Sequence, residues 1–529
     1  MTPPRETRHR MWAEVEADWD LVIIGGGITG AGLFHEAARA GVRCLLLEAH
    51  DFGSGTSSRS SKLVHGGARY MKNLQFHLTF ESVRERDRLV RQAPGLVHKL
   101  PFMLTNYRSD PTPAWMYAAG FALFDWMAGK WEHERLAPAN MLARCPQLNA
   151  DGLESGILYF DAETDDSRLV YRLTQEGRLA GGLALNYARV AGFHRSPDRQ
   201  VRGVQVFDTS GESLPTVRAS AAVVVNATGA WADSLRQQLG RGDRLRLLRG
   251  AHLIFSGDRF PLQQAISLLH PVDRRLLFAI PWEGGVVFGT TDLDLAQPMT
   301  TDLAITQTET DYLFAALDHS FPGLALGPDD VVSTFAGVRS VIDTGKTDPS
   351  RESREHAIWQ EDGLVTVTGG KLTIFRRMAH DVLRHIRHQL PGRPSFDPAA
   401  PILPLGPALP ADAALLPAAG QRLVGRLGTL AVEALAGAAD ADLLPIGGTP
   451  TVWAEIGWAA RAESIVHLED LLLRRTRLGL LLPDGGAAHH DRLRAIVQPA
   501  LGWDDDLWRQ EWDAYQALCR CCHNLPQPG

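Results

Sequence analysis

The chain has 529 residues, of which 45% are hydrophobic and 22% are charged, and its formal net charge is −7. This length exceeds what one ordinary hydrophobic core accommodates, so two or three structural units are expected. The composition is typical of a folded protein and excludes disorder of the whole chain. The negative charge gives no support to nucleic-acid binding, so no nucleic-acid partner is expected.

The N-terminal part of the sequence predicts a parallel βαβ unit. Residues 20–24 (DLVII) form an apolar run typical of a buried strand, 30–40 have helical apolar spacing, and 42–48 (VRCLLLE) predict a second strand. Gly41 marks the expected end of the helix. The unit has the length that a crossover between parallel strands requires.

Further strands are predicted at wide intervals along the chain. Residues 51–67 are rich in Gly and Ser and predict a loop, and 68–92 predict a helix. These strands are separated by long insertions. This spacing indicates a nucleotide-binding domain whose sequence is interrupted by a second, sheet-based domain. The later strands are expected at 201–207, 221–226, 252–255, 276–280, 285–288 and 364–368.

These patterns divide the chain into four parts. Residues 1–19 form an N-terminal extension, and 20–388 hold the nucleotide-binding domain with its interleaved second domain. Residues 389–420 are rich in Pro and Ala and predict a linker. Residues 421–529 predict a separate C-terminal helical domain, with long amphipathic runs such as 453–478.

The five cysteines do not suggest a disulfide framework, because they are odd in number and sparse in a long chain. Three of them lie in the segment 519–523 (CRCCH), which lacks a second ligand pair at zinc-like spacing. We therefore expect a reduced C-terminal tail in a reducing compartment, and no metal site.

Neither a signal peptide nor a membrane-spanning helix is expected. The first twenty residues are charged and contain no apolar core region. The most apolar stretch, 115–129, contains Asp125 and is shorter than the roughly 20 residues that a spanning helix needs. Any membrane association would be peripheral.

The strongest local motif is the G-x-G-x-x-G pattern of Gly25, Gly27 and Gly30. The first glycine permits a tight turn, the second lets a pyrophosphate approach the backbone, and the third allows close packing of helix and strand. The following helix directs its partial positive charge at the phosphates. Glu48 ends the next strand, where a carboxylate accepts hydrogen bonds from a ribose and disfavours a 2′-phosphate.

Two later glycine turns distinguish FAD from NAD. Ala227, Thr228 and Gly229 follow an apolar strand, and Gly370 and Lys371 lie between another strand and a helix. Together with the N-terminal motif they resemble the glutathione-reductase-like family of FAD proteins. This resemblance implies an α/β fold with a Rossmann-type FAD-binding domain, an interleaved antiparallel-sheet substrate domain and a C-terminal helical domain.

Residues 56–70 (TSSRSSKLVHGGARY) resemble the signature of the aerobic FAD-dependent glycerol-3-phosphate dehydrogenase family. Further family-like segments follow in the expected order at 249–252 (RGAH), 280–282 (IPW), 289–292 (GTTD), 336–339 (AGVR) and 370–373 (GKLT). The resemblance covers roughly residues 20–390 and is weaker in the C-terminal domain. Ser340 stands where the family has proline, and we expect it to loosen the loop that carries Arg339.

The resemblance implies FAD as the cofactor and sn-glycerol-3-phosphate as the substrate. Arg69, Tyr70 and Arg354 would bind the phosphate, for which the planar guanidinium fork is suited. For Arg354, which lies in a charged run, a surface ion pair is the strong alternative. The implied FAD contacts are Gly25, Gly27, Gly30, Glu48, Thr56, Ser57, Ser61, Lys62, Val64, His65, Ala227, Thr228, Gly229, Gly370, Lys371, Leu372 and Thr373, together with Val190, which ends a strand and would touch the adenine.

Oxidation of the substrate requires hydride loss from C2 to flavin N5 and proton loss from the C2 hydroxyl. By resemblance, Arg339 would stabilise the developing alkoxide. His252 would accept the proton, or would merely form a hydrogen bond inside a strand. Lys371 would lie near flavin N1 and O2, where its charge favours the anionic reduced flavin.

The resemblance also implies membrane quinone as the electron acceptor and a cytoplasmic protein bound peripherally to the inner face of a membrane. Residues 115–129, with Trp126 and Trp131 nearby, could lie on the bilayer as an amphipathic segment, or form a buried helix. The sequence leaves open whether the chain forms a homodimer. Three alternatives remain: a glycerol-3-phosphate oxidase that reduces oxygen to peroxide, an FAD oxidase of another small molecule such as an amino acid, and a flavin-binding redox sensor without turnover.

Overall fold

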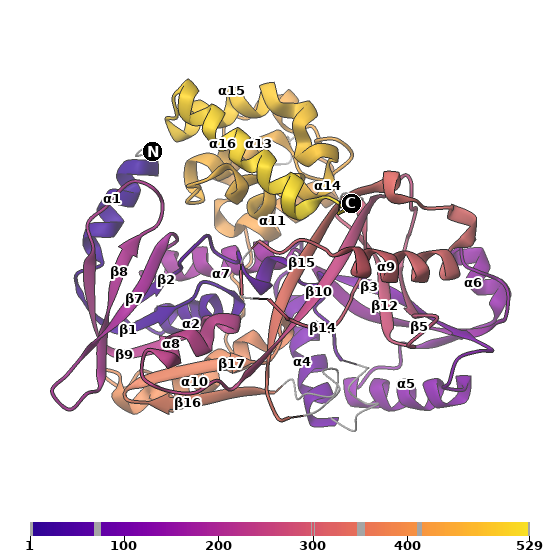
Figure 1. Ribbon diagram of the computed structural model, residues 1–529, viewed down its shortest axis with the longest axis horizontal. Coiled ribbons are helices and arrows are strands. Elements are labelled where there is room, and N and C mark those ends of the chain that lie inside the picture. The colour runs from indigo at the N-terminus through magenta and orange to yellow at the C-terminus, as the bar shows by residue number, and fades with distance from the viewer. Residues whose placement is uncertain are drawn as a thin grey trace.

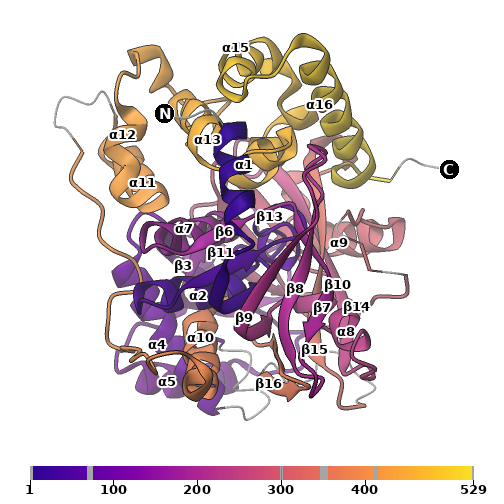
Figure 2. The same cartoon turned by 90° about the vertical axis from the view of Figure 1, so that its left-hand side faces the viewer.

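The computed structural model describes residues 4–67, 76–297, 299–300, 302–345, 355–409 and 415–526. The molecule contains two large sheets, with a group of helices from the C-terminal part of the chain packed across one end (Figure 1). Helix α5 (Ala114–Ala128) lies at the opposite end from these helices in both views (Figures 1 and 2).

The first sheet is built around parallel strands. Its central strand β1 pairs in parallel with β9 on one side and β2 on the other. The sheet runs in the order β16 (His356–Glu361), β17 (Leu364–Gly369), β9 (Val217–Asn226), β1 (Asp18–Ile24), β2 (Cys44–Leu47) and β6 (Leu183–Leu185), while β8 (Val201–Asp208) joins β9 and pairs with β7 (Ala188–Arg195).

Both faces of this sheet are covered, which explains why its central strands read as continuous apolar runs. Leu21 and Ile23 of β1 belong to a core with the helices α2 (Ile28–Arg39), α7 (Asp166–Leu179) and α10 (Phe375–Ile386). Val22 and Ile24 pack on the other face with β7, β8 and Trp12 of α1 (Pro4–Glu14). The layered α/β architecture predicted for the first domain is confirmed.

The second sheet is mostly antiparallel, with one parallel pair between β3 and β11. Its order is β14 (Leu293–Asp294), β10 (Leu245–Ser256), β13 (Gly285–Gly289), β12 (Leu276–Trp282), β11 (Ala265–Leu269), β3 (Val97–Tyr107), β5 (Leu153–Thr164) and β4 (Glu134–Leu136), and β15 (Val331–Ile342) pairs with β10. Helices flanking this region are α4 (Phe76–Gln92), α5, α6 (Pro138–Arg144) and α9 (Gln307–Ser320), whereas Leu235 of α8 (Ala232–Gln237) packs in the core of the first sheet.

The C-terminal helices share a hydrophobic core with the second sheet. Ile254, Trp282 and Phe335 of that sheet pack against Ile456, Leu472 and other apolar residues of the helices. The helices are α11 (Pro417–Leu427), α12 (Ala431–Leu435), α13 (Trp453–Ala462), α14 (Leu478–Leu481), α15 (His490–Leu501) and α16 (Asp505–Leu518), with π-helical turns η10 (Asp470–Arg475) and η12 (Cys519–His523).

Three local predictions are wrong. The run 453–478 is not one helix, because α13 ends at Ala462 and Ser464 has a positive φ of 55°. Arg339 lies in strand β15 rather than in a loop, and Ser340 pairs there with Leu247. The tail is not fully reduced, because Cys521 and Cys522 form a disulfide.

Candidate active site

The glycine turn after β1 leaves no room for side chains. Gly25 has a φ of 105°, and a Cβ there would lie 2.7 Å from the carbonyl oxygen of Ala227. A Cβ at Gly30 would overlap the carbonyl oxygen of Gly25. The backbone at the start of α2 therefore stays open to a phosphate, as a dinucleotide requires.

Four of the predicted cofactor segments meet at one edge of the first sheet, because each follows the carboxyl end of a parallel strand. The turn at Gly25 follows β1, Glu48 follows β2, Ala227–Gly229 follows β9, and Gly370 follows β17. Ligands of open α/β sheets bind at this edge. Glu48 accepts hydrogen bonds from the Gly26 amide (2.6 Å) and the His50 amide (2.9 Å).

The third of these turns is also well ordered. The Ala227 amide donates to the Ile24 carbonyl oxygen of β1 at 2.8 Å, and the Thr228 hydroxyl donates to Asn226 Oδ1 at 2.7 Å. These bonds place Ala227, Thr228 and Gly229 directly beside the Gly25 turn. A glycine cradle, a helix N-terminus and a half-buried carboxylate together fit the FAD that the sequence predicts.

The segment Thr56–Ser61 connects this edge to the second sheet. Ser57 Oγ accepts a hydrogen bond from the Ile28 amide at the start of α2, at 2.9 Å. The Thr56 hydroxyl donates to the Val338 carbonyl oxygen of β15. Ser61 Oγ lies 2.8 Å from His252 Nε2 of β10. The segment thus contacts both the helix that faces the phosphates and the strands that carry the predicted catalytic residues.

His252 and Arg339 lie on the same face of the β10–β15 pair. His252 is opposite Phe335 and Leu248 is opposite Arg339, with the pair Gly250–Gly337 between them. Residues that face each other across two strands, and every second residue along them, share a face. Arg339 forms an ion pair with Asp292.

His252 is held as a neutral imidazole. Its ring stacks on Phe335 with 4.5 Å between centroids. Burial and the nearby charge of Lys62 lower the pKa of His252 to about 3. Among the described residues, Nδ1 has no hydrogen-bond partner. A neutral imidazole retains one nitrogen lone pair that can accept a proton.

The Lys62 side chain makes its contacts within the protein. It is fully buried, donates to the Ser58 carbonyl oxygen at 2.6 Å and pairs with Asp166 at 3.0 Å. Burial lowers the pKa of Lys62 to about 8, although the charge of Asp166 opposes this. The predicted cofactor contact of Lys62 stays a prediction, while its side chain supports the fold of the 56–61 segment.

Lys371, Leu372 and Thr373 continue from the Gly370 turn, where φ is 71°. The Thr373 hydroxyl donates to the His65 carbonyl oxygen at 3.1 Å, which ties this turn to the stretch that includes Val64. The charge of Lys371 faces Asp161, a carboxyl group whose pKa is raised by burial and lowered less strongly by Arg86 and Lys371.

The roles of the remaining predicted residues stay predictions. Arg69, Tyr70 and Arg354 lie outside the described residues. Val190 does not end a strand but is the third residue of β7, where it is buried and pairs with Val206. Its contact with adenine stays a prediction.

Sequence reasoning missed the C-terminal contribution to this site. Arg477 Nη1 donates to the Ser58 carbonyl oxygen at 3.2 Å, Nε donates to Asp165 at 2.9 Å, and Nη2 pairs with Asp166. Asp166 in turn accepts from the amide and the hydroxyl of Ser60 at 3.0 and 2.7 Å. No local motif marks Arg477, because a charged residue in a helical pattern is usually exposed to solvent.

The fold and this site define an FAD-dependent oxidoreductase. The family model "FAD dependent oxidoreductase" matches residues 20–375, and the model "C-terminal domain of alpha-glycerophosphate oxidase" matches 377–507. The aerobic glycerol-3-phosphate dehydrogenase of Staphylococcus aureus (strain USA300) is 36% identical over 379 residues, which cover 70% of this chain and 68% of that protein.

Solved structures share this fold. The glycerol-3-phosphate dehydrogenase from Bacillus halodurans complexed with FAD aligns over 98% of both chains, with a TM-score of 0.76 and 26% identity. The L-alpha-glycerophosphate oxidase from Mycoplasma pneumoniae shares the fold over 73% of this chain and 98% of its own, with a TM-score of 0.56 and 15% identity. The chain belongs to the aerobic FAD-dependent glycerol-3-phosphate dehydrogenase family.

Proposed function

We propose that this chain oxidises sn-glycerol-3-phosphate to dihydroxyacetone phosphate and passes the electrons to membrane quinone. The observation that carries the proposal is the shared face of His252 and Arg339, joined through Ser61 to the segment that reaches the FAD-binding helix. The names of the 36% identical relatives support the choice of substrate.

The residues of this face supply a base and a fixed cation. The Gly25 turn and Glu48 would hold FAD, which would supply the hydride acceptor for C2 of the substrate. Arg339 would stabilise the negative charge that develops on the C2 oxygen, and Asp292 orients its guanidinium. His252, which is neutral at physiological pH, would accept the hydroxyl proton. Arg69, Tyr70 and Arg354 would bind the phosphate, and Lys371 would bring a positive charge to the bound flavin.

A membrane acceptor is supported by the outer surface of α5. Trp115 and Trp126 are 67% and 75% exposed, and Trp131, just beyond the helix, is 71% exposed. The only charged side chain of the helix, Asp125, points inward and accepts hydrogen bonds from the amides of Glu132 and His133. The alternative of a buried helix is therefore wrong.

Exposed tryptophans on an apolar helix suit the interface of a bilayer. No helix within the described ranges is long and apolar enough to cross a membrane. We place the chain at the cytoplasmic face, with the α5 end against the bilayer and the C-terminal helices directed away from it (Figures 1 and 2).

The substrate and the acceptor are tested in one anaerobic experiment. Addition of sn-glycerol-3-phosphate to the FAD-loaded protein should bleach the flavin spectrum, and a soluble quinone analogue should restore it. Flavin that stays oxidised would refute the substrate. Flavin that is bleached, reacts slowly with the quinone analogue and is rapidly restored by oxygen with release of peroxide would favour the oxidase alternative.

Membrane binding is tested by sedimentation with anionic lipid vesicles. The double variant Trp115→Ser and Trp126→Ser should lose vesicle binding. A matched control, Leu405→Ser with Leu416→Ser, removes two other exposed apolar side chains (72% and 78% exposed) and should bind as the wild type does. Equal binding by both variants would refute the assignment to α5.

A further inference from the structure

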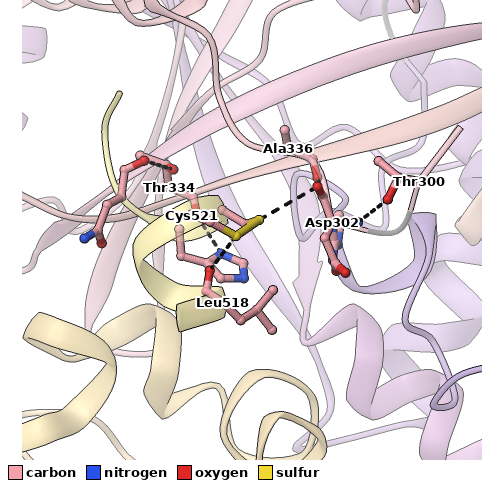
Figure 3. Close-up of a disulfide and its surroundings, with 10 residues drawn as sticks. Thr300, Asp302, Thr334, Ala336, Leu518 and Cys521 are labelled. Atoms are coloured by element: carbon pink, nitrogen blue, oxygen red, sulfur yellow. Dashed lines mark hydrogen bonds and ion pairs between the residues drawn. A yellow bond between two sulfur atoms is a disulfide. The ribbon is translucent and has the colours of Figure 1, made fainter. Parts of the chain in front are cut away.

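The C-terminal segment carries a disulfide between adjacent cysteines. Cys521 and Cys522 lie in η12, directly after α16, and Figure 3 shows Cys521 beside Leu518 and Thr334. A disulfide stabilises a fold chiefly by closing a loop in the unfolded chain, and the benefit grows with loop length. A bridge at a sequence separation of one residue closes the shortest loop available. Stabilisation of the fold therefore does not account for this bridge.

The two sulfurs differ in their access to solvent. Cys521 is exposed and Cys522 is buried, whereas the three free cysteines, Cys44, Cys145 and Cys519, are all buried. A thiolate arriving from solvent therefore meets Cys521 first, and Cys522 becomes the leaving group. Carbonyl oxygens of Leu518 and Asp302 lie 3.5 and 3.8 Å from Cys521 Sγ and Cys522 Sγ. They can accept the S–H groups of the reduced pair.

The segment that holds the pair is docked on β15. His523 Nδ1 lies 2.9 Å from the Thr334 carbonyl oxygen, and the Thr334 hydroxyl donates to the Asn524 carbonyl oxygen at 3.2 Å. Thr334 is next to Phe335, whose ring stacks on His252. The docked tail is thus one residue away from the predicted catalytic face.

A second connection runs through Asp302. Its carbonyl oxygen faces Cys522 Sγ, and its carboxylate pairs with Arg59 at 3.3 Å. Arg59 donates to the Ala336 carbonyl oxygen of β15 at 3.4 Å and belongs to the segment Thr56–Ser61. Thr334 and Asp302, which contact the segment that holds the disulfide, are therefore both linked to elements of the candidate active site.

We propose that Cys521 and Cys522 form a thiol–disulfide exchange site for small thiols, which controls the docking of the tail on β15. A thiolate attacks Cys521 Sγ, the Cys521–Cys522 bond breaks, and Cys522 leaves as a thiolate that takes a proton from water. A second thiolate attacks the incoming sulfur, the external disulfide departs, and Cys521 is released as a thiolate. Two thiols are oxidised and one protein disulfide is reduced. The effect on turnover rests on the proposed function, whereas the exchange chemistry does not.

The exchange site is tested on the full-length, FAD-loaded protein by thiol alkylation and mass spectrometry of the C-terminal peptide. Cys521 and Cys522 should resist iodoacetamide before reduction, and both should be alkylated after treatment with dithiothreitol. Phenylarsine oxide, which bridges two thiols with loss of one water, should add to the reduced pair. The site is refuted if both cysteines are alkylated before reduction and oxidised glutathione fails to pair them.

The regulatory part is tested by turnover with a dye as electron acceptor. Reduction should lower kcat/KM of the wild type at least twofold, and the double variant Cys521→Ser with Cys522→Ser should not respond to reductant. Cys519→Ser is the matched control, because burial raises the pKa of the Cys519 thiol to about 11 and keeps it unreactive; this variant should respond as the wild type does. If the two cysteines are reduced and turnover does not change, the proposal that their redox state controls the docking of the tail is refuted. Loss of turnover in every form would refute only the proposed function.

Discussion

Replacement of Arg477 by methionine removes the contacts that this residue of the C-terminal domain makes with the 56–61 segment and its supporting aspartates. In the wild type the guanidinium contacts Asp165, Asp166 and the Ser58 carbonyl oxygen, all of them buried. Asp165 then retains Arg426 at 3.0 Å, and Asp166 retains Lys62 at 3.0 Å. The variant has a shorter, uncharged side chain and one cation fewer among these buried carboxylates.

The magnitude follows from this charge imbalance. Removal of one partner of a buried ion pair costs about 3–5 kcal/mol of unfolding free energy. A chain of 529 residues has an unfolding entropy of about 1.1 kcal/mol per kelvin at about 2.1 cal/mol/K per residue. If the chain unfolds as one unit, Tm should fall by about 3–5 °C. Flavin occupancy should also fall, because Ser58 and Ser60 lose their support beside Ser57.

The assay combines differential scanning calorimetry with the visible absorbance of bound flavin. Arg509→Met is the matched control, because Arg509 is exposed and pairs only with Asp506 on the surface, and a change within about 0.5 kcal/mol is expected there. Arg477→Lys retains the charge but not the fork, and should recover part of the Tm and of the flavin content. A Tm within 1 °C of wild type for Arg477→Met, with full flavin content, would refute the positioning role.

The remaining predictions concern the cofactor turn, the reacting face and one buried acid. Gly30→Ala should abolish flavin retention on gel filtration, since its Cβ would overlap the Gly25 carbonyl oxygen; retained flavin would contradict the fit of the turn to FAD. Arg339→Lys should lower kcat/KM by about 10²–10³, as removal of one oxyanion donor does; a loss below tenfold would exclude that role. Burial, and then the charge of Glu283, raise the pKa of Glu163 to about 8. The stability that Glu163 contributes is full below pH 4.5, its ordinary value, and is lost as pH rises through 8. Glu163→Gln should therefore match the wild-type Tm near pH 4.5 and exceed it increasingly up to pH 8, by up to about 1.4 kcal/mol per pH unit; a pH-independent difference would contradict the shift.

The features that the sequence by itself determined are local. A strand before the Gly25 turn, a helix after it and Glu48 at the end of the next strand specify a dinucleotide site through backbone geometry alone, and the structure has each of them in place. The long apolar runs likewise predicted the central parallel strands. A strand that is covered on both faces is apolar at every position, so it does not alternate between apolar and polar residues.

Only the tertiary structure decided what covers each surface and which distant charges meet. Arg477 contacts Asp166 across 311 residues of sequence, and the Lys62 side chain pairs with the same aspartate. His252 and Arg339 share a face through the register of β10 and β15. Hydrophobic periodicity reports that a residue is buried, but not against which partner. For this reason the sequence left open whether residues 115–129 are exposed or buried, and the docking of Cys522 beside Asp302 had no signal in it.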